Sequence, residues 1–195
     1  MIDPSTINAG QALKELLDGN KRYTSGIYSN AHLSMQRRIE VVRAQHPIAV
    51  VLGCSDSRVL PEIVFNQGIG DLFVIRTAGN IVDAIALGSI EYAIEHLHAP
   101  LIVVLGHEAC GAVTAAVKGG EAPGHIADVV KAIQPAVDKT RGKPGNAIDN
   151  AVRANIESVM AQLKRELIWQ EVKYPLKIVG AYYALESGVV TVIAQ

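Results

Sequence analysis

Two cysteines and one histidine are placed along the chain where they could bind one metal ion. Cys54 follows the apolar run 47–53, and His107 and Cys110 follow the apolar run 101–105. Short apolar runs between breakers are typical of buried parallel strands, whose carboxyl ends meet at one edge of a sheet. Two thiolates and an imidazole suit zinc, and three protein ligands leave a fourth position for water, as in catalytic sites. The sequence therefore predicts one Zn²⁺ ion per chain that activates water.

The same three residues allow other interpretations. The cysteines could be small buried hydrophobic residues, with His107 as a core histidine, or they could form a single disulfide in an oxidising compartment. A redox dithiol is disfavoured because the chain has no Cys-x-x-Cys motif. A phosphatase-type Cys-x5-Arg loop is excluded because residue 60 is Leu and Arg58 comes too early. The joint placement of the three residues at two strand ends favours the metal.

Asp56 and Arg58 lie two residues apart on the loop that follows Cys54. A carboxylate that pairs with a guanidinium stays ionised. Such an Asp can accept a hydrogen bond from hydroxide at the metal, orient its lone pair toward an electrophile, and disfavour ligands that lack this proton. The alternative is an ion pair that only closes the loop.

The rest of the chain predicts the elements that position these residues. Apolar runs predict strands at 47–53, 72–76 and 101–105. Helical spacing of apolar residues predicts helices at 11–23, with Gly19-Asn20 as its end signal, and at 81–97, 108–118, 126–137 and 147–167. Leu185-Glu186-Ser187-Gly188 predicts a hairpin between strands 177–184 and 189–193. The expected fold is α/β, with a mostly parallel central sheet flanked by helices, a C-terminal antiparallel hairpin and an N-terminal helical arm.

Composition narrows the class of protein. A chain of 195 residues suits one domain, and a formal charge of -1 without any Lys/Arg block argues against nucleic acid or a membrane surface as a partner. A small-molecule substrate is expected instead. No apolar run approaches the ~20 residues that span a bilayer, and the N-terminus lacks the regions of a secretory signal, so the expected location is cytoplasmic.

The Cys-Ser-Asp-Ser-Arg motif at 54–58 and the His-x-x-Cys-Gly motif at 107–111 resemble, in this order, the motifs of the β-class carbonic anhydrases. The resemblance covers residues 1–195 as one domain, with a helical arm at 1–30, a zinc-site core at 45–118 and a hairpin at 175–195. It implies that Cys54, His107 and Cys110 bind zinc and that Asp56 and Arg58 form the catalytic dyad. The implied reaction is the reversible hydration of carbon dioxide to bicarbonate and a proton, the carbonate dehydratase reaction of a lyase.

The resemblance also implies a substrate pocket and an oligomer. In plant-like members a Gln, a Phe and a Tyr line the cleft, and these match Gln45, Phe73 and Tyr92; either aromatic residue could instead belong to the core. Members gated by bicarbonate have a Trp where this chain has Val51, so the plant-like, ungated type is favoured, although Arg76 is retained. Residues 77–80 differ from the sequence that is commoner in this family, and they place small residues at the cleft edge. A homodimer or homotetramer is expected, with an N-terminal helix that embraces the partner and clefts at the subunit interface.

Other functions stay open at this point. A hydrolase of carbonyl sulfide or carbon disulfide would use the same ligands, and a noncatalytic zinc protein would have its fourth metal position filled. Asp56 itself could fill that position and release it as pH rises. Turnover requires a proton shuttle, for which the sequence selects none of its candidates, His32, His46, His96, His98 and His125.

Overall fold

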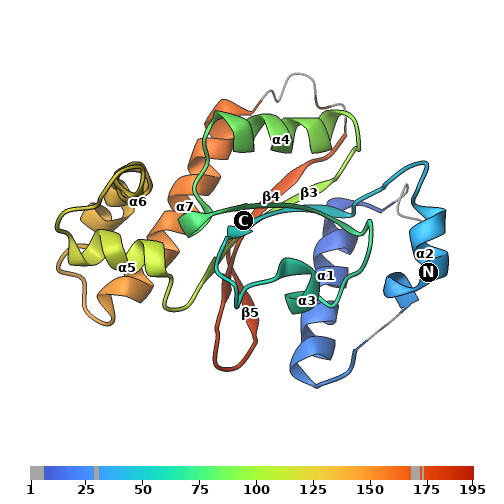
Figure 1. Ribbon diagram of the computed structural model, residues 1–195, viewed down its shortest axis with the longest axis horizontal. Helices are drawn as coiled ribbons and strands as arrows, with labels where there is room; N and C mark the ends of the chain where they lie inside the picture. Colours follow the sequence, from blue (N-terminus) through green and yellow to red (C-terminus); the bar gives the residue numbers. More distant parts are fainter. Residues whose placement is uncertain (1–6, 29–30, 168–171, 173) are drawn as a thin grey trace.

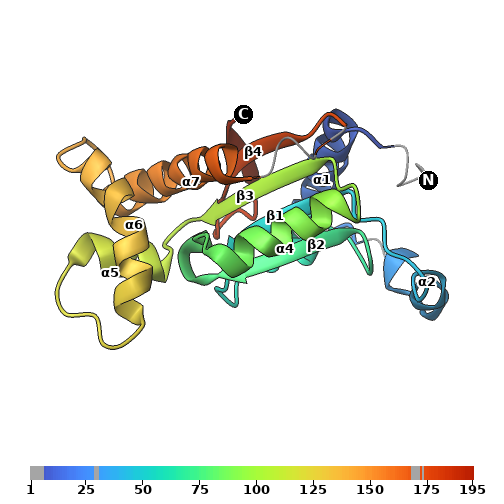
Figure 2. The same ribbon diagram turned by 90° about the horizontal axis from the view of Figure 1, so that it is seen from above.

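A computed structural model of the 195-residue protein describes residues 7–28, 31–167, 172 and 174–195. Its centre is a five-stranded sheet in the order β2-β1-β3-β4-β5 (Figures 1 and 2). The strands are β1 Ala49–Cys54, β2 Leu72–Thr77, β3 Leu101–His107, β4 Lys177–Tyr183 and β5 Val190–Ala194. The first four strands of this order are parallel, and only β5 pairs antiparallel, with β4. The predicted α/β fold with a C-terminal hairpin is confirmed.

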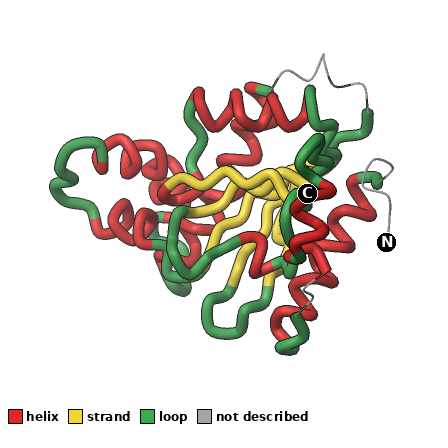
Figure 3. Tube along the Cα trace, turned by 45° about the vertical axis from the view of Figure 1, so that its right-hand side comes forward, coloured by secondary structure: helices red, strands yellow, loops and turns green. Residues whose placement is uncertain are grey.

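Helices cover both faces of the sheet, as the tube drawing shows (Figure 3). On one face, helices α4 Ala84–Glu95 and α7 Ala147–Glu166 pack over Val50, Leu52 and Cys54 of β1. On the other, α1 Ala9–Thr24 and α3 Pro61–Val64 pack over Ala49 and Val51 (Figure 1). Because both faces are covered, β1 and β3 are buried along their whole length, which explains their continuous apolar sequences.

The ends of the sheet are covered by different helices (Figure 2). Helices α5 Gly111–Lys118 and α6 Ile126–Thr140 lie beyond the carboxyl ends of β1 and β3. The short helices η2 Ala31–Leu33 and α2 Met35–Glu40, which were not predicted, belong to the segment that precedes β1, and α2 lies at the opposite end. The short α3 and the 3-10 turn η3 Ala78–Asn80 were not predicted either.

Helix α1 continues beyond Gly19-Asn20, so the predicted end signal is wrong. Gly19 is instead a contact residue, since an added Cβ would lie 1.8 Å from the carbonyl oxygen of Phe65. Asn20 is buried, and its amide donates hydrogen bonds to the carbonyls of Val64, at 3.0 Å, and Gly188, at 2.8 Å. The predicted arm includes residues 1–6 and 29–30, which lie outside the described residues, and its embrace of a partner stays a prediction.

The helix predicted at 108–118 begins at Gly111, because the preceding residues form the loop between His107, at the end of β3, and the predicted ligand Cys110. In this loop the N–H of Glu108 donates to the carbonyl of Tyr183, at 2.9 Å, and Ala109 has a left-handed backbone with φ of +51°. The helix predicted at 81–97 begins at Ala84, because the side chain of Asp83 caps its first turn. The final hairpin turns through Gly188, with φ of +72°.

Candidate metal centre

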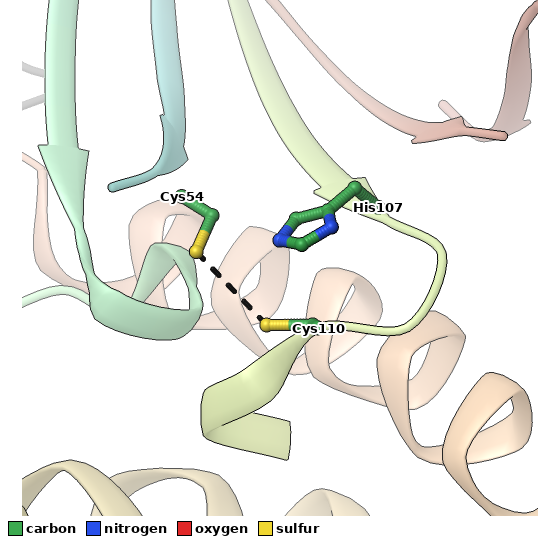
Figure 4. Close-up of side chains that lie close together, drawn as sticks. All are labelled: Cys54, His107 and Cys110. Atoms are coloured by element: carbon green, nitrogen blue, oxygen red, sulfur yellow. Dashed lines mark hydrogen bonds between the residues drawn. The ribbon is translucent and has the colours of Figure 1, made fainter. Parts of the chain in front are cut away.

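Cys54, His107 and Cys110 converge on one point at the carboxyl edge of the sheet (Figure 4). Cys54 ends β1, His107 ends β3, and Cys110 immediately precedes α5. Their ligand atoms all lie within 4.8 Å of one another, and the side chains are buried. The two sulfurs are 4.0 Å apart, close to the ~3.8 Å that tetrahedral zinc with bonds of about 2.3 Å to each sulfur requires. The arrangement fits a zinc ion.

His107 presents a free lone pair to this point. Its Nδ1 lies 2.8 Å from the backbone carbonyl of Glu108. A carbonyl can only accept, so Nδ1 carries the proton and Nε2 is the unprotonated nitrogen. Nε2 is fully buried and has no hydrogen-bond partner among the described residues. A buried nitrogen without a partner destabilises the fold unless something satisfies it, and a metal ion does so.

The two cysteines are free, so the disulfide interpretation is wrong for this structure. A hydrogen bond from Cys110 lowers the pKa of Cys54, and backbone N–H groups act in the same direction against burial. The same bond to Cys54, and then burial, raise the pKa of Cys110. The pair therefore holds one proton between two sulfurs, in the place where a divalent cation would bind both as thiolates.

Asp56 and Arg58 form a bidentate pair beside the ligands. The Arg58 guanidinium donates to both carboxylate oxygens of Asp56, at 2.9 and 2.8 Å, and the Arg58 backbone N–H donates to one of them at 2.9 Å. The Arg58 side chain, above all, holds the pKa of Asp56 well below its usual range. One carboxylate oxygen lies 3.9 Å from Nε2 of His107. An ionised acceptor therefore faces the point where the three ligand atoms converge.

Arg76 and the backbone of β2 hold this loop in place. The Arg76 side chain donates to the carbonyls of Cys54, at 2.9 Å, and Asp56, at 2.6 Å. The N–H of Ser55 donates to the carbonyl of Thr77 at 3.1 Å. Arg76 is thus committed to the backbone of the ligand loop.

Comparison with known proteins agrees with this site. Residues 49–190 match the family described as carbonic anhydrase. Carbonic anhydrase 2 of Mycobacterium tuberculosis is 41% identical over 192 residues, which cover 95% of this chain and 92% of that protein. The chain belongs to the β-carbonic anhydrases. Within this family it is an enzyme, a lyase that acts as a carbonate dehydratase.

Other relatives of this β-carbonic anhydrase support the same assignment. The carbonic anhydrase of Mycolicibacterium smegmatis is 44% identical over 161 residues, which cover 80% of this chain and 78% of that one. The structure of the Coccomyxa β-carbonic anhydrase in complex with acetazolamide superposes with a TM-score of 0.75 at 27% identity, covering 93% of this chain and 86% of that one. The plant-like, ungated type that Val51 favours stays a prediction.

The predicted pocket residues of this carbonic anhydrase lie together, but away from the metal ligands. The rings of Phe73 and Tyr92 are 6.3 Å apart, and Gln45 and Tyr92 line one cavity of about 830 Å³. Gln45 precedes β1, whereas Cys54 ends it. Strand β1, from Ala49 to Cys54, is by itself about 16 Å long. One chain does not bring the predicted pocket to its own metal centre.

The five candidate proton shuttles do not form a single group. His32 bonds to Asp71 at 2.5 Å, and His125 is exposed beside Asp128. The other three, His46, His96 and His98, line the same cavity as Gln45 and Tyr92. The structure selects none of them as the shuttle.

Proposed function

We propose that this enzyme hydrates carbon dioxide reversibly to bicarbonate and a proton, at a zinc ion held by Cys54, His107 and Cys110. The observation that supports it best is the buried, unpartnered Nε2 of His107, which converges with two sulfurs next to an ionised carboxylate. Zinc in such a site polarises water so that hydroxide is available near neutral pH. The protein supplies the geometry around that chemistry.

Asp56 is ionised and lies where it can orient the oxygen that attacks carbon dioxide. Because Arg58 keeps it ionised, Asp56 accepts a hydrogen bond from the O–H of that oxygen and does not donate one. This hydrogen bond would leave a lone pair of the oxygen free to attack the carbon of carbon dioxide. An anion without a proton would face the carboxylate directly and is repelled. Arg58 acts by holding Asp56 in this geometry through three hydrogen bonds.

The substrate pocket, in this proposal, is completed by a second copy of the chain. Gln45, Phe73 and Tyr92 form a group at the amino end of the strands, too far from the metal ligands of the same chain. Apolar side chains are exposed here: Val42, which lines the same cavity, is 78% exposed, and Tyr92 itself is 49% exposed. A partner that covers them would place the Gln45 amide and the two aromatic rings against its own metal centre. A homodimer, or a tetramer built from dimers, follows.

A subunit-mixing experiment tests whether the site is shared. Asp56→Asn damages the metal side and Gln45→Ala the pocket side, so each variant alone has low activity. After the two variants are unfolded and refolded together, half of the dimers are mixed and each mixed dimer contains one intact site. We expect about a quarter of the wild-type activity to return. No recovery, with mixed dimers confirmed by mass spectrometry, would assign both residues to a site within one chain.

The reaction itself is tested by a pH series of carbon dioxide hydration with zinc-loaded protein, run in parallel with carbonyl sulfide and carbon disulfide. Hydration that increases with pH supports the proposal. A zinc-loaded protein that is inactive toward carbon dioxide above pH 8 contradicts it, and turnover of the sulfur gases alone would assign the alternative hydrolase. None of the helices in the described segments combines the length and hydrophobicity needed to cross a bilayer. The cytoplasmic location stays a prediction.

A further inference from the structure

The turn η3, which follows β2, contacts one of the metal ligands through its backbone. The N–H of Gly79 donates to Sγ of Cys54, with the two heavy atoms 3.3 Å apart in a buried environment. Gly79 and Asn80 both have left-handed backbones, with φ of +71° and +47°. Glycine adopts this conformation without strain, but Asn80 does so at a cost that neighbouring groups must offset.

Asn155 of α7 holds it from the other side. Its side-chain amide donates to the carbonyl of Gly79 at 2.9 Å, across 76 positions of sequence. Gly79 is also confined by packing, because an added Cβ would lie 2.7 Å from Cδ1 of Ile133 and 3.2 Å from Cβ of Ala112. The backbone of Gly79 is thus bonded at both ends, to Asn155 through its carbonyl and to Cys54 through its N–H.

Asn155 is an unusual residue for its place on α7. It is only 2% exposed and lies among the buried apolar residues of that helix, such as Val152, Ile156 and Val159. Packing alone would be served better by a leucine, since a buried amide must be bonded to be tolerated. The bond to Gly79 is what makes an amide useful here.

We propose that Asn155 is a positioning residue of the metal centre, which acts by aiming the Gly79 N–H at the sulfur of Cys54. The inference rests on the zinc site of the proposed function. An N–H···S hydrogen bond withdraws electron density from a thiolate, so the metal receives less charge from it and polarises its other ligands more strongly. Groups that orient metal ligands in this way typically change metal affinity or activity by about 10- to 100-fold.

The test compares Asn155→Leu with Val159→Ala, which disturbs the buried face of the same helix one turn later without touching Gly79. In the cobalt-substituted proteins, the sulfur-to-metal charge-transfer band should move to lower energy in Asn155→Leu, because the Cys54 thiolate becomes richer in electrons. Zinc affinity at neutral pH, measured by competition with a chelator, should fall about 10- to 100-fold in the same variant, because a Cys54 thiolate without this hydrogen bond is held less well in place and binds a proton more strongly. Val159→Ala should leave both unchanged. Equal bands and equal affinities in the two variants would overturn the proposal.

A second measurement begins with the wild-type protein. In wild-type protein loaded with an NMR-active isotope of cadmium, the N–H···S bond should transmit a scalar coupling between the metal and the amide proton of Gly79. Asn155→Ser, whose side chain is too short to reach the Gly79 carbonyl, should weaken that coupling. Cadmium bound by Cys54 with no coupling to Gly79 overturns the role of Asn155 and leaves the proposed function intact. Failure of cadmium to bind Cys54, His107 and Cys110 overturns both.

Discussion

Removal of zinc should lower the melting temperature of this protein by an amount that the structure allows us to estimate. Without metal, Nε2 of His107 is buried and unpartnered, and two buried sulfurs share a proton, so the native state binds the metal and the unfolded chain has no preformed site. At free zinc 1,000 times the dissociation constant, the native state is stabilised by about 4.1 kcal/mol. In a chain of 195 residues each kcal/mol corresponds to about 2–4 °C. The expected fall is therefore about 8–16 °C.

The melting temperature should also depend on the concentration of free zinc, which gives a more specific test. Each tenfold increase in free zinc above the dissociation constant adds about 1.4 kcal/mol, or about 3–6 °C. Differential scanning calorimetry in a series of metal buffers, at constant protein concentration, measures this slope. His107→Ala should abolish it, whereas His125→Ala, which removes a fully exposed histidine, should preserve it. A melting temperature that responds to zinc equally in wild type and His107→Ala would refute the assignment of the ligands.

Four further predictions concern the site and the packing of the fold. Asp56→Asn should retain zinc but lower kcat/KM for carbon dioxide by about 100- to 1,000-fold, since it loses a charged acceptor beside the reacting oxygen; full activity in a zinc-loaded variant would remove Asp56 from the mechanism. Because its partner sulfur raises the pKa of Cys110, zinc must displace about one proton at neutral pH. Calorimetry in buffers of different ionisation enthalpy counts that proton, and zinc affinity should increase with pH until Cys110 ionises by itself. Gly106→Ala, whose Cβ would lie 2.6 Å from Ile156, should destabilise the fold by about 1–3 kcal/mol in urea unfolding. Gly88→Ala, in open space within α4, should instead stabilise it by about 0.5–1 kcal/mol.

The convergence of Cys54, His107 and Cys110 could be predicted from sequence because two features combine. β1 and β3 are buried on both faces, so their residues form continuous apolar runs that end visibly at Gly53 and Gly106. Parallel neighbours must then end at the same edge, which brings together whatever polar residues follow them. Cys54 and His107 are those residues. The short spacing from His107 to Cys110 completes the set without any long-range information.

The features that could not be predicted depend on contacts between distant segments. Gly19-Asn20 has the composition of a helix end, yet the helix continues because Gly19 packs against the carbonyl of Phe65 and Asn20 bonds to the end of α3 and to the final hairpin. Asn155 has the same character. Within its own helix it is one polar residue on an apolar face, and its purpose is visible only beside Gly79. A local sequence pattern reflects contacts between residues that are close in the sequence. The roles of Gly19, Asn20 and Asn155 depend instead on residues that are distant in the sequence and close in space.

The position of Gln45 and Tyr92 relative to the metal centre could not be predicted from the sequence for a different reason. Family resemblance assigns them to the substrate pocket, and the structure groups them in one cavity, yet that cavity lies at the amino end of the strands. No rearrangement of one folded chain moves a residue before β1 to the carboxyl end of β1, because the strand between them is fixed by hydrogen bonds on both sides. If both residues serve the reaction, the chain that provides the pocket is a different copy from the chain that provides the metal ligands. Catalysis would then require assembly, and dilution that separates the subunits should abolish activity while each chain still retains its zinc.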